Sequence, residues 1–232
     1  MLHKETVKEE TMQVLEALMK DAYLKEFYLV GGTSLSLRYG HRMSDDIDLF
    51  SHKSFDKSAL GRHMEMNYDL FYKEPKMNGY CCYPSGQKVD LFHYPAPIIK
   101  GIEEIEGIRI LSVEDVAAMK IITISIEATR IKDFFDIHTI LEHKSLEELA
   151  AVYVQKFTDR NVMEDFEMIA RHEMVQEEFR KLQVLNKELK AKKVFEDLTR
   201  KVKAYMNSTK KNQPKLLAKK PRKSGRNKGR KL

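Results

Sequence analysis

The stretch from Tyr28 to Phe50 reads YLVGGTSLSLRYGHRMSDDIDLF, and it decides the fold. Three apolar residues are followed by Gly31 and Gly32, which predicts the end of a buried strand and then a sharp turn. Glycine lets the backbone turn and approach a ligand closely, because it carries no Cβ atom. A short helix is expected next, with Thr33 as its N-cap and its unpaired backbone N–H groups facing whatever lies above the glycines.

A second strand is expected at 46–50, where acidic and apolar residues alternate. Side chains alternate across a strand, so Asp46 and Asp48 share one face while Ile47 and Leu49 share the other. Two carboxylates about 7 Å apart on one face repel each other unless a cation lies between them. Mg²⁺ commonly takes one or two carboxylates together with substrate phosphates. The pattern therefore favours a magnesium site over the alternative of solvated aspartates on a surface strand.

A β-hairpin is expected further along the chain, with strands at 79–83 and 88–94. The four residues between them, Pro-Ser-Gly-Gln, are typical of a turn. Asp90 lies in the second strand between two apolar residues. A carboxylate in such a run is costly to bury unless it is paired or bound to metal. The alternative is a partly exposed aspartate on an edge strand.

The order of strand, Gly-Gly-Thr, short helix and R-x-S-x-D-I-D-L-F resembles the signature of the DNA polymerase β-type nucleotidyltransferase superfamily. Within that superfamily the sequence of this motif most resembles the AbiEii/AbiGii-type toxin family of bacterial toxin–antitoxin systems, and the resemblance covers roughly residues 1–160. The resemblance implies an α+β fold, with a small mixed sheet, flanking helices and a C-terminal helical extension. It also implies that Asp90 supplies a third metal-binding carboxylate from a strand beside the one that carries Asp46 and Asp48.

Two later segments, AAMK at 117–120 and KDFFD at 132–136, resemble further motifs of the toxin family. In that family a lysine of one helix reaches the nucleotide phosphates, and an aspartate of the next helix supports the active site. The resemblance thus gives roles to Lys120 and Asp133, with Lys132 and Asp136 as second choices. Without it, Lys120 would be interpreted as a solvated lysine, and Lys132 with Asp136 as an i,i+4 surface pair.

The activity implied is transfer of a nucleotide from an NTP such as ATP or GTP to an acceptor hydroxyl, with two Mg²⁺ ions. The residues expected to bind the nucleotide are Gly31, Gly32, Thr33, Ser34, Arg42, Ser44 and Lys120. The expected catalytic residues are Asp46, Asp48, Asp90, Lys120 and Asp133, of which the first three would hold the metal ions.

The family implies an acceptor that is either RNA, with tRNA ends as a target class, or a protein, and it implies a cognate antitoxin as a partner. A protein-modifying nucleotidyltransferase of the antitoxin type is an alternative. Its signature, GS-x-A-R-G, matches the sequence GGTSLSL at 31–37 less well. A non-catalytic nucleotide-binding module is a second alternative. The presence of Thr33 and of three aspartates at the expected positions argues against a decayed site.

Charge is distributed unevenly along the 232 residues, whose net charge is +6. Residues 207–232 contain eleven lysines and arginines and no acid, so the rest of the chain carries a net charge of −5. We expect three parts: a catalytic core at 1–110, a helical domain completing the active site at 111–206, and a disordered basic tail at 207–232 suited to phosphate contacts. No apolar run approaches the ~20 residues that span a bilayer, and no signal segment is evident, so a cytoplasmic protein is expected.

Overall fold

The structure is a computed structural model that describes residues 1–127, 130–170, 183–185 and 190–212. Its strands are β1 (Tyr28–Val30), β2 (Ile47–Ser51), β3 (Leu70–Lys76), β4 (Gly79–Pro84), β5 (Val89–His93), β6 (Ile102–Ile105) and β7 (Ile108–Leu111). They form one seven-stranded sheet in the order β3-β4-β5-β2-β1-β7-β6. β2 pairs antiparallel with β1 and parallel with β5, so the sheet is mixed. This confirms the expected α+β fold.

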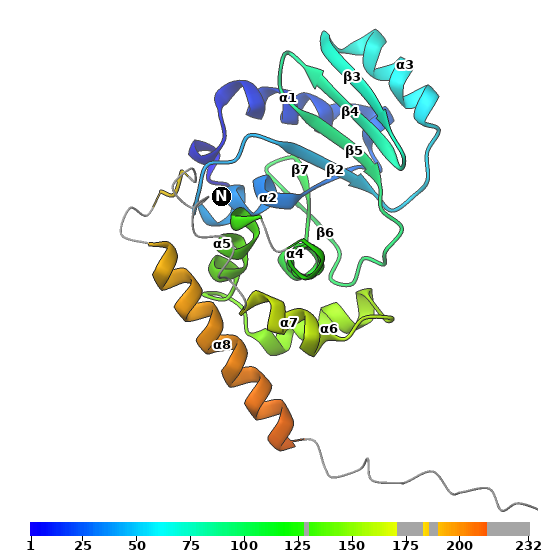
Figure 1. Cartoon of the computed structure of the whole chain (residues 1–232). Helices are drawn as coiled ribbons and strands as arrows, with labels where there is room; N and C mark the ends of the chain where they lie inside the picture. The colour runs from blue at the N-terminus through cyan, green and yellow to red at the C-terminus, as the bar shows by residue number, and fades with distance from the viewer. Residues whose placement is uncertain (128–129, 171–182, 186–189, 213–232) are drawn as a thin grey trace, which may run out of the picture.

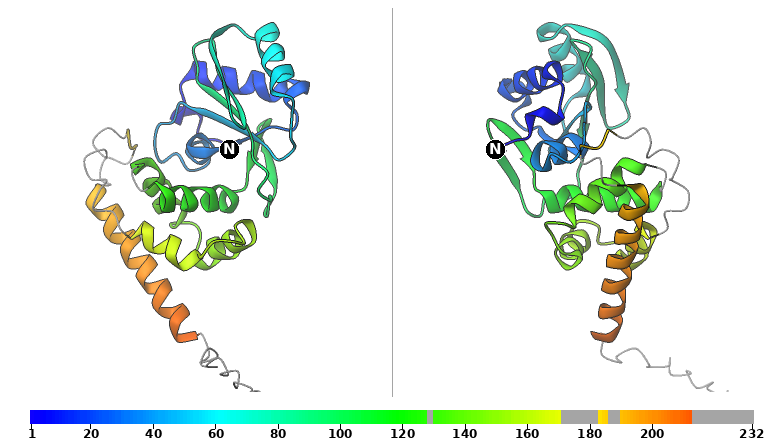
Figure 2. Two further views of the ribbon diagram at one scale, coloured as in Figure 1. Left: turned by 45° about the vertical axis from the view of Figure 1, so that its right-hand side comes forward. Right: turned by 90° about the vertical axis from the view of Figure 1, so that its left-hand side faces the viewer.

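The helices are α1 (Glu9–Lys20), α2 (Gly31–Tyr39), α3 (Lys57–Asn67), α4 (Val113–Ile126), α5 (Ile131–Ile140), α6 (Leu146–Lys156), α7 (Val162–Ile169) and α8 (Ala191–Asn212). Short 3₁₀ helices lie at Lys4–Thr6 and Ala22–Leu24. Helices α1 and α3 lie on one side of the sheet, and α4 to α8 lie on the other (Figures 1 and 2). No helix among the described residues combines the length and the apolar composition needed to cross a membrane.

Alternation along the strands divides the buried residues into two cores. Leu49 of β2 and Leu91 of β5 are fully buried in the core on the side of α1 and α3. Val30 of β1 lies in the other core, and Phe50 of β2 packs against it together with α4 and the later helices. Asp48 lies on the same face as Phe50 because the two residues are two apart in a strand. The predicted site therefore faces the helical part of the chain.

Helix α8 packs into the core and extends past residue 207, where the disordered basic tail was expected to begin. Phe195, Leu198 and Val202 are at most 1% exposed, and the helix continues to Asn212. The sequence-based boundary was therefore six residues too early. Asn207, Ser208 and Thr209 are only moderate helix formers, but Tyr205 and Met206 just before them still pack against the core, and packing of this kind sustains a helix.

Two segments far apart in the sequence, 41–43 and 183–185, meet in the loop that precedes β2. The amide of Met43 donates to the carbonyl of Gln183 over 3.0 Å, and the amide of Leu185 donates to the carbonyl of His41 over 3.2 Å. Arg42 and Val184 form the β-bridge between these two hydrogen bonds. Helical pattern was expected throughout 161–206; the parts at 171–182 and 186–189 lie outside the described residues.

Candidate active site

Asp48 and Asp90 lie opposite each other on neighbouring parallel strands, β2 and β5. Both side chains are partly buried, while Asp46 is exposed and directly precedes β2. Burial, together with the charges of Asp90 and then Asp46, raises the pKa of Asp48 to about 6. The ionised carboxylate is thus disfavoured first by burial and then by neighbouring negative charge, and a bound cation would favour the ionised form.

The three carboxylates fit a divalent metal ion by their chemistry and by the register of β2 and β5. Oxygen ligands of this kind are those that Mg²⁺ prefers. Across the part of the chain that the structure describes, no three His, Cys, Asp or Glu side chains are already gathered as a complete metal-binding group. Of the three expected ligands, Asp48 and Asp90 are already held in register on adjacent strands, whereas Asp46 is exposed to solvent.

Asp90 has two further neighbours. The ammonium of Lys88 donates to Asp90 Oδ2 over 2.7 Å. Cys81, opposite Asp90 on β4, is buried, and its burial and its hydrogen bond to Asp90 raise the pKa of the thiol to about 11. The sequence analysis missed Lys88, although a signal was present: residues two apart in an extended segment share a face, so Lys88 lies on the face of Asp90.

The glycine turn lies directly against Asp48. Gly31 has a φ of +72°, and a Cβ atom built on it would lie 2.2 Å from Asp48 Oδ2. A Cβ atom on Gly32 would lie 2.1 Å from Arg42 Nη2. Both positions therefore require glycine for close approach, and Gly31 requires it for its backbone conformation as well. The first turn of α2, with its free backbone N–H groups, starts at this point.

A buried network of charged side chains lies beside the glycine turn and is centred on Asp136. Arg42 donates two hydrogen bonds to Asp136, of 2.7 and 2.8 Å. Lys120 lies 2.5 Å from Asp133 Oδ1 and 2.8 Å from Asp136 Oδ2. Burial alone would raise the pKa of Asp136, but the Arg42 and Lys120 charges hold it well below its usual range. His41 completes the network with a 2.7 Å contact to Asp136.

A pocket of about 170 Å³ joins these parts. It is lined by the two glycines, by Asp48 and by Lys120, Arg130 and Asp133 from the helical side. Phe50 and Met119 supply an apolar wall. The pocket thus brings together the N-terminus of α2, the Asp48 carboxylate and two cations that are paired with Asp133. Groups of this kind suit a nucleoside phosphate with a metal ion.

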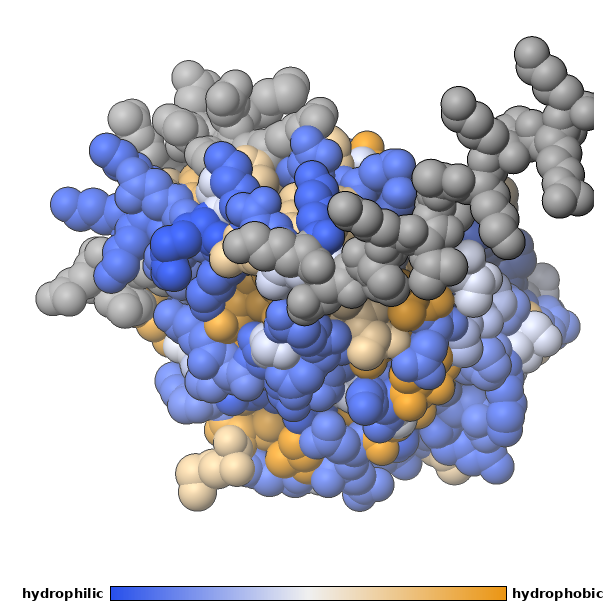
Figure 3. Space-filling view, turned by 90° about the horizontal axis from the view of Figure 1, so that it is seen from below, coloured by the Kyte–Doolittle hydropathy of each residue, from blue (hydrophilic) through white to orange (hydrophobic). Residues whose placement is uncertain are grey.

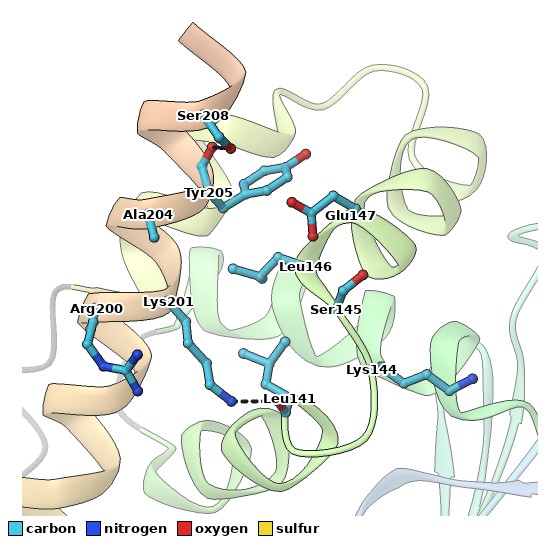
Figure 4. Close-up of a pocket in the computed structure, with 10 residues that line it drawn as sticks. All are labelled: Leu141, Lys144, Ser145, Leu146, Glu147, Arg200, Lys201, Ala204, Tyr205 and Ser208. Carbon is cyan, nitrogen blue, oxygen red and sulfur yellow. Dashed lines mark hydrogen bonds between the residues drawn. The ribbon is translucent and has the colours of Figure 1, made fainter. Parts of the chain in front are cut away.

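A larger pocket of about 450 Å³ lies between the start of α6 and the side of α8 (Figure 4). Its cations are already committed: Lys201 donates to the carbonyl of Leu141, Lys144 lies 2.7 Å from Glu114, and Arg200 lies 2.9 Å from Asp197. Size alone therefore does not identify the reactive site. Cations are paired in both pockets, but of the two only the smaller one contains the glycine turn and Asp48.

The family model described as "Nucleotidyl transferase AbiEii toxin, Type IV TA system" matches residues 13–73 and 84–220. The chain belongs to this AbiEii toxin family. It is thus a nucleotidyltransferase, as its motifs indicated. An uncharacterized protein of Aquifex aeolicus (strain VF5) is 30% identical over 208 residues, covering 87% of this chain and 98% of the relative.

Two solved structures from Helicobacter pylori are similar to this AbiEii-family nucleotidyltransferase in fold. JHP933 is 20% identical with a TM-score of 0.54, over 88% of this chain and 95% of that chain. A putative nucleotidyltransferase is 22% identical with a TM-score of 0.55, over 89% of this chain and 96% of that chain. At these identities the likeness concerns the fold alone.

The AbiEii-family chain brings five of the predicted site residues to one pocket: Gly31, Gly32, Asp48, Lys120 and Asp133. Lys120 is only 8% exposed, so it is not the solvated lysine of the alternative interpretation. Asp136 is fully buried and Lys132 is exposed, so the two do not form a surface pair.

Four other predicted nucleotide contacts are directed into the protein. Thr33 is not the N-cap, because α2 already begins at Gly31; its hydroxyl donates to the carbonyl of Asp46 and lies 3.0 Å from that of Ser44. The hydroxyl of Ser34 donates to the carbonyl of Gly31 over 2.8 Å. Arg42 is 2% exposed and held by Asp136. These four side chains shape the turn, and their contact with nucleotide stays a prediction.

Proposed function

We propose that this nucleotidyltransferase uses Mg²⁺ and an NTP to add a nucleotide to an RNA hydroxyl, as the toxin of a bacterial toxin–antitoxin system. The observation that carries the proposal is the placement of Asp48 directly against the glycine turn, with Asp90 opposite it on the neighbouring strand. Membership in the AbiEii family supports the role as a toxin with a cognate antitoxin.

In the proposed reaction the triphosphate lies at the N-terminus of α2, where free backbone N–H groups and the helix dipole favour negative charge. Divalent ions held by Asp46, Asp48 and Asp90 would neutralise the departing pyrophosphate and lower the pKa of the acceptor hydroxyl. Asp90 is our candidate for accepting the proton of that hydroxyl. Lys120, which lines the same pocket, offsets charge on the phosphates.

The charge of the C-terminal region supports RNA as the acceptor. Helix α8 contains seven lysines and arginines against two acids, and residues beyond it add nine more. Lys192 and Arg200 are exposed on α8. The face formed by α6, α7 and α8 is mostly hydrophilic, with small hydrophobic patches (Figure 3). Cations along such a surface would neutralise phosphates and release counterions from the nucleic acid.

The test is a labelling experiment with each of the four α-labelled NTPs, total tRNA and a protein extract. We expect Mg²⁺-dependent label on RNA that EDTA abolishes. Asp48→Asn should reduce labelling at least 100-fold, by removing a metal-binding charge at the reacting centre. Asp45→Asn is the matched control, because Asp45 pairs with Lys8 at the surface over 2.9 Å and should leave labelling intact.

Other outcomes would separate the alternatives. Label on protein alone, still lost in Asp48→Asn, would overturn the RNA acceptor and retain nucleotidyl transfer. No label on any acceptor, together with no Mg²⁺-dependent NTP binding, would mean that the site is a non-catalytic nucleotide-binding module.

A further inference from the structure

We infer that Lys88 is a built-in counter-ion which competes with the divalent metal ion for Asp90 and thereby weakens metal binding. The inference rests on the metal-binding part of the proposed function, but it concerns a residue outside the ligand set. It makes Lys88 a positioning residue: its ammonium holds the metal-free carboxylates in place and has to leave Asp90 when the metal arrives.

The backbone fixes Lys88 at the same level of the sheet as the acidic residues. The amide of Ile47 donates to the carbonyl of Lys88 over 3.0 Å, which ties the start of β5 to the start of β2. From there the ammonium of Lys88 reaches Asp90 Oδ2 at 2.7 Å. It thus occupies a coordination position of an oxygen that the metal ion needs.

Lys88 experiences the whole acidic cluster rather than one partner. Asp46, Asp90 and Asp48 each act on its ammonium through their charges. A divalent ion placed among the same carboxylates would therefore meet both a competitor for Asp90 and a positive charge that repels it. Lys88 and the metal ion cannot both satisfy Asp90 Oδ2 fully.

Two other cations near the cluster, Lys120 and Arg42, are already held by other aspartates. Lys120 is 9% exposed at its side chain and is held by two aspartates, Asp133 and Asp136. Arg42 is held by both oxygens of Asp136. The side chain of Lys88 is 38% exposed, and its one ion pair within the described residues joins it to Asp90. Lys88 can therefore swing into water at little cost, whereas the other two cannot.

The inference is tested by Mn²⁺ titration of the metal-stripped, full-length protein by calorimetry, with thermal melting in parallel. Lys88→Met should bind Mn²⁺ roughly tenfold more tightly, because one competing charge is gone. The metal-free variant should melt at a lower temperature than the wild type, and Mn²⁺ should raise its melting temperature by more. Lys88→Arg keeps the charge and should bind Mn²⁺ within about threefold of the wild type.

The matched control is Lys53→Met, which removes the same charge from an exposed pair with Glu26 at 2.9 Å. It should leave the Mn²⁺ affinity unchanged. If Lys88→Met binds Mn²⁺ no more tightly than the wild type, the inference is overturned, while Mn²⁺ binding by the wild type leaves the proposed metal site standing. If neither protein binds Mn²⁺, the proposed metal site fails and the inference fails with it.

Discussion

At the residue scale, two aspartates show how opposite environments act on the same chemical group. Burial, and then the charges of Asp90 and Asp46, raise the pKa of Asp48 to about 6. Asp136 is more deeply buried, yet the adjacent Arg42 and Lys120 charges keep its pKa well below the usual range. Asp48 is therefore suited to receive a cation, while Asp136 already has its cations and serves as an anchor.

The Asp48 carboxylate should destabilise the metal-free protein at neutral pH. Its folded pKa lies above the unfolded value of 3.8, so the folded state gains most from Asp48 below pH 4 and loses that gain as the pH rises to about 6. In EDTA at pH 7.5, we expect Asp48→Asn to raise the free energy of unfolding by about 1–3 kcal/mol. The increase should vanish at pH 4. Urea unfolding at both pH values measures it, and an equal effect at both would contradict this account.

Removing the charge of Asp136 should be far more damaging. Asp136→Asn leaves Arg42 and Lys120 with uncompensated buried charge, so we expect a loss of about 3–5 kcal/mol. Because the folded pKa of Asp136 is lowered, the stability it provides is present above the unfolded value of 3.8 and disappears as the pH falls below it.

A suitable comparison is Asp197→Asn, whose carboxylate is 30% exposed, pairs with the exposed Arg200 and lies 3.5 Å from His138 Nε2. Surface pairs contribute under about 1 kcal/mol, so this variant should stay close to the wild type in urea unfolding. Equal losses for Asp136→Asn and Asp197→Asn would show that the buried network does not anchor the fold.

At the element scale, the sequence predicted β1, β2 and the β4–β5 hairpin, because short-range signals define each of them. It did not predict β3 or β6, in which polar and charged residues at an edge replace clear alternation. The start of α2 was also placed too late. Thr33 is a good N-cap in isolation, but here its hydroxyl is satisfied by Asp46 and Ser44 across the turn.

The turn between β1 and α2 depends on Gly31. Gly31→Ala would add a Cβ atom 2.2 Å from the Asp48 carboxylate and would also strain a backbone with a φ of +72°. We expect a loss of about 2 kcal/mol or more in stability, together with loss of nucleotidyl transfer. Gly86→Ala isolates the backbone contribution, because its φ is +78° and no atom lies within 4 Å of the added Cβ. That variant should lose about 1 kcal/mol and remain active.

Both glycine variants are compared by urea unfolding and by the labelling assay. A Gly31→Ala protein that transfers nucleotides as well as Gly86→Ala does would show that the close approach to Asp48 is dispensable.

At the scale of the whole molecule, the sequence predicted most of the site's acidic part and little of what supports it. The Asp-Ile-Asp motif indicated Asp48, and the family resemblance indicated Asp90; the structure places the two opposite each other on adjacent strands. The residues Arg42 and Asp136 are 94 positions apart in the sequence, and a local sequence pattern cannot predict a contact between residues so far apart. Lys88 was missed for another reason. A lysine two residues from an aspartate in a strand is common, and only the pairing of β5 with β2 shows that Asp46 and Asp48 lie near it as well.

The uneven charge of the molecule gives a prediction for RNA binding. Deleting residues 213–232 removes nine lysines and arginines and no acid. We expect the deletion to weaken RNA binding about tenfold or more at 0.1 M salt, and to make the dependence of affinity on salt less steep. Filter binding over a salt series measures both. An unchanged salt dependence would exclude phosphate contacts by these residues.

The bridge between Arg42 and Val184 makes the loop before β2 depend on a segment that is synthesised much later. The first strand, glycine turn and acidic residues leave the ribosome early, but the backbone partners of the loop at 41–43 follow about 140 residues later. Long loop closure is slow, so the N-terminal half waits for its C-terminal partner. A translation product that ends before residue 183 would therefore lack both the bridge beside Arg42 and the core contacts of α8.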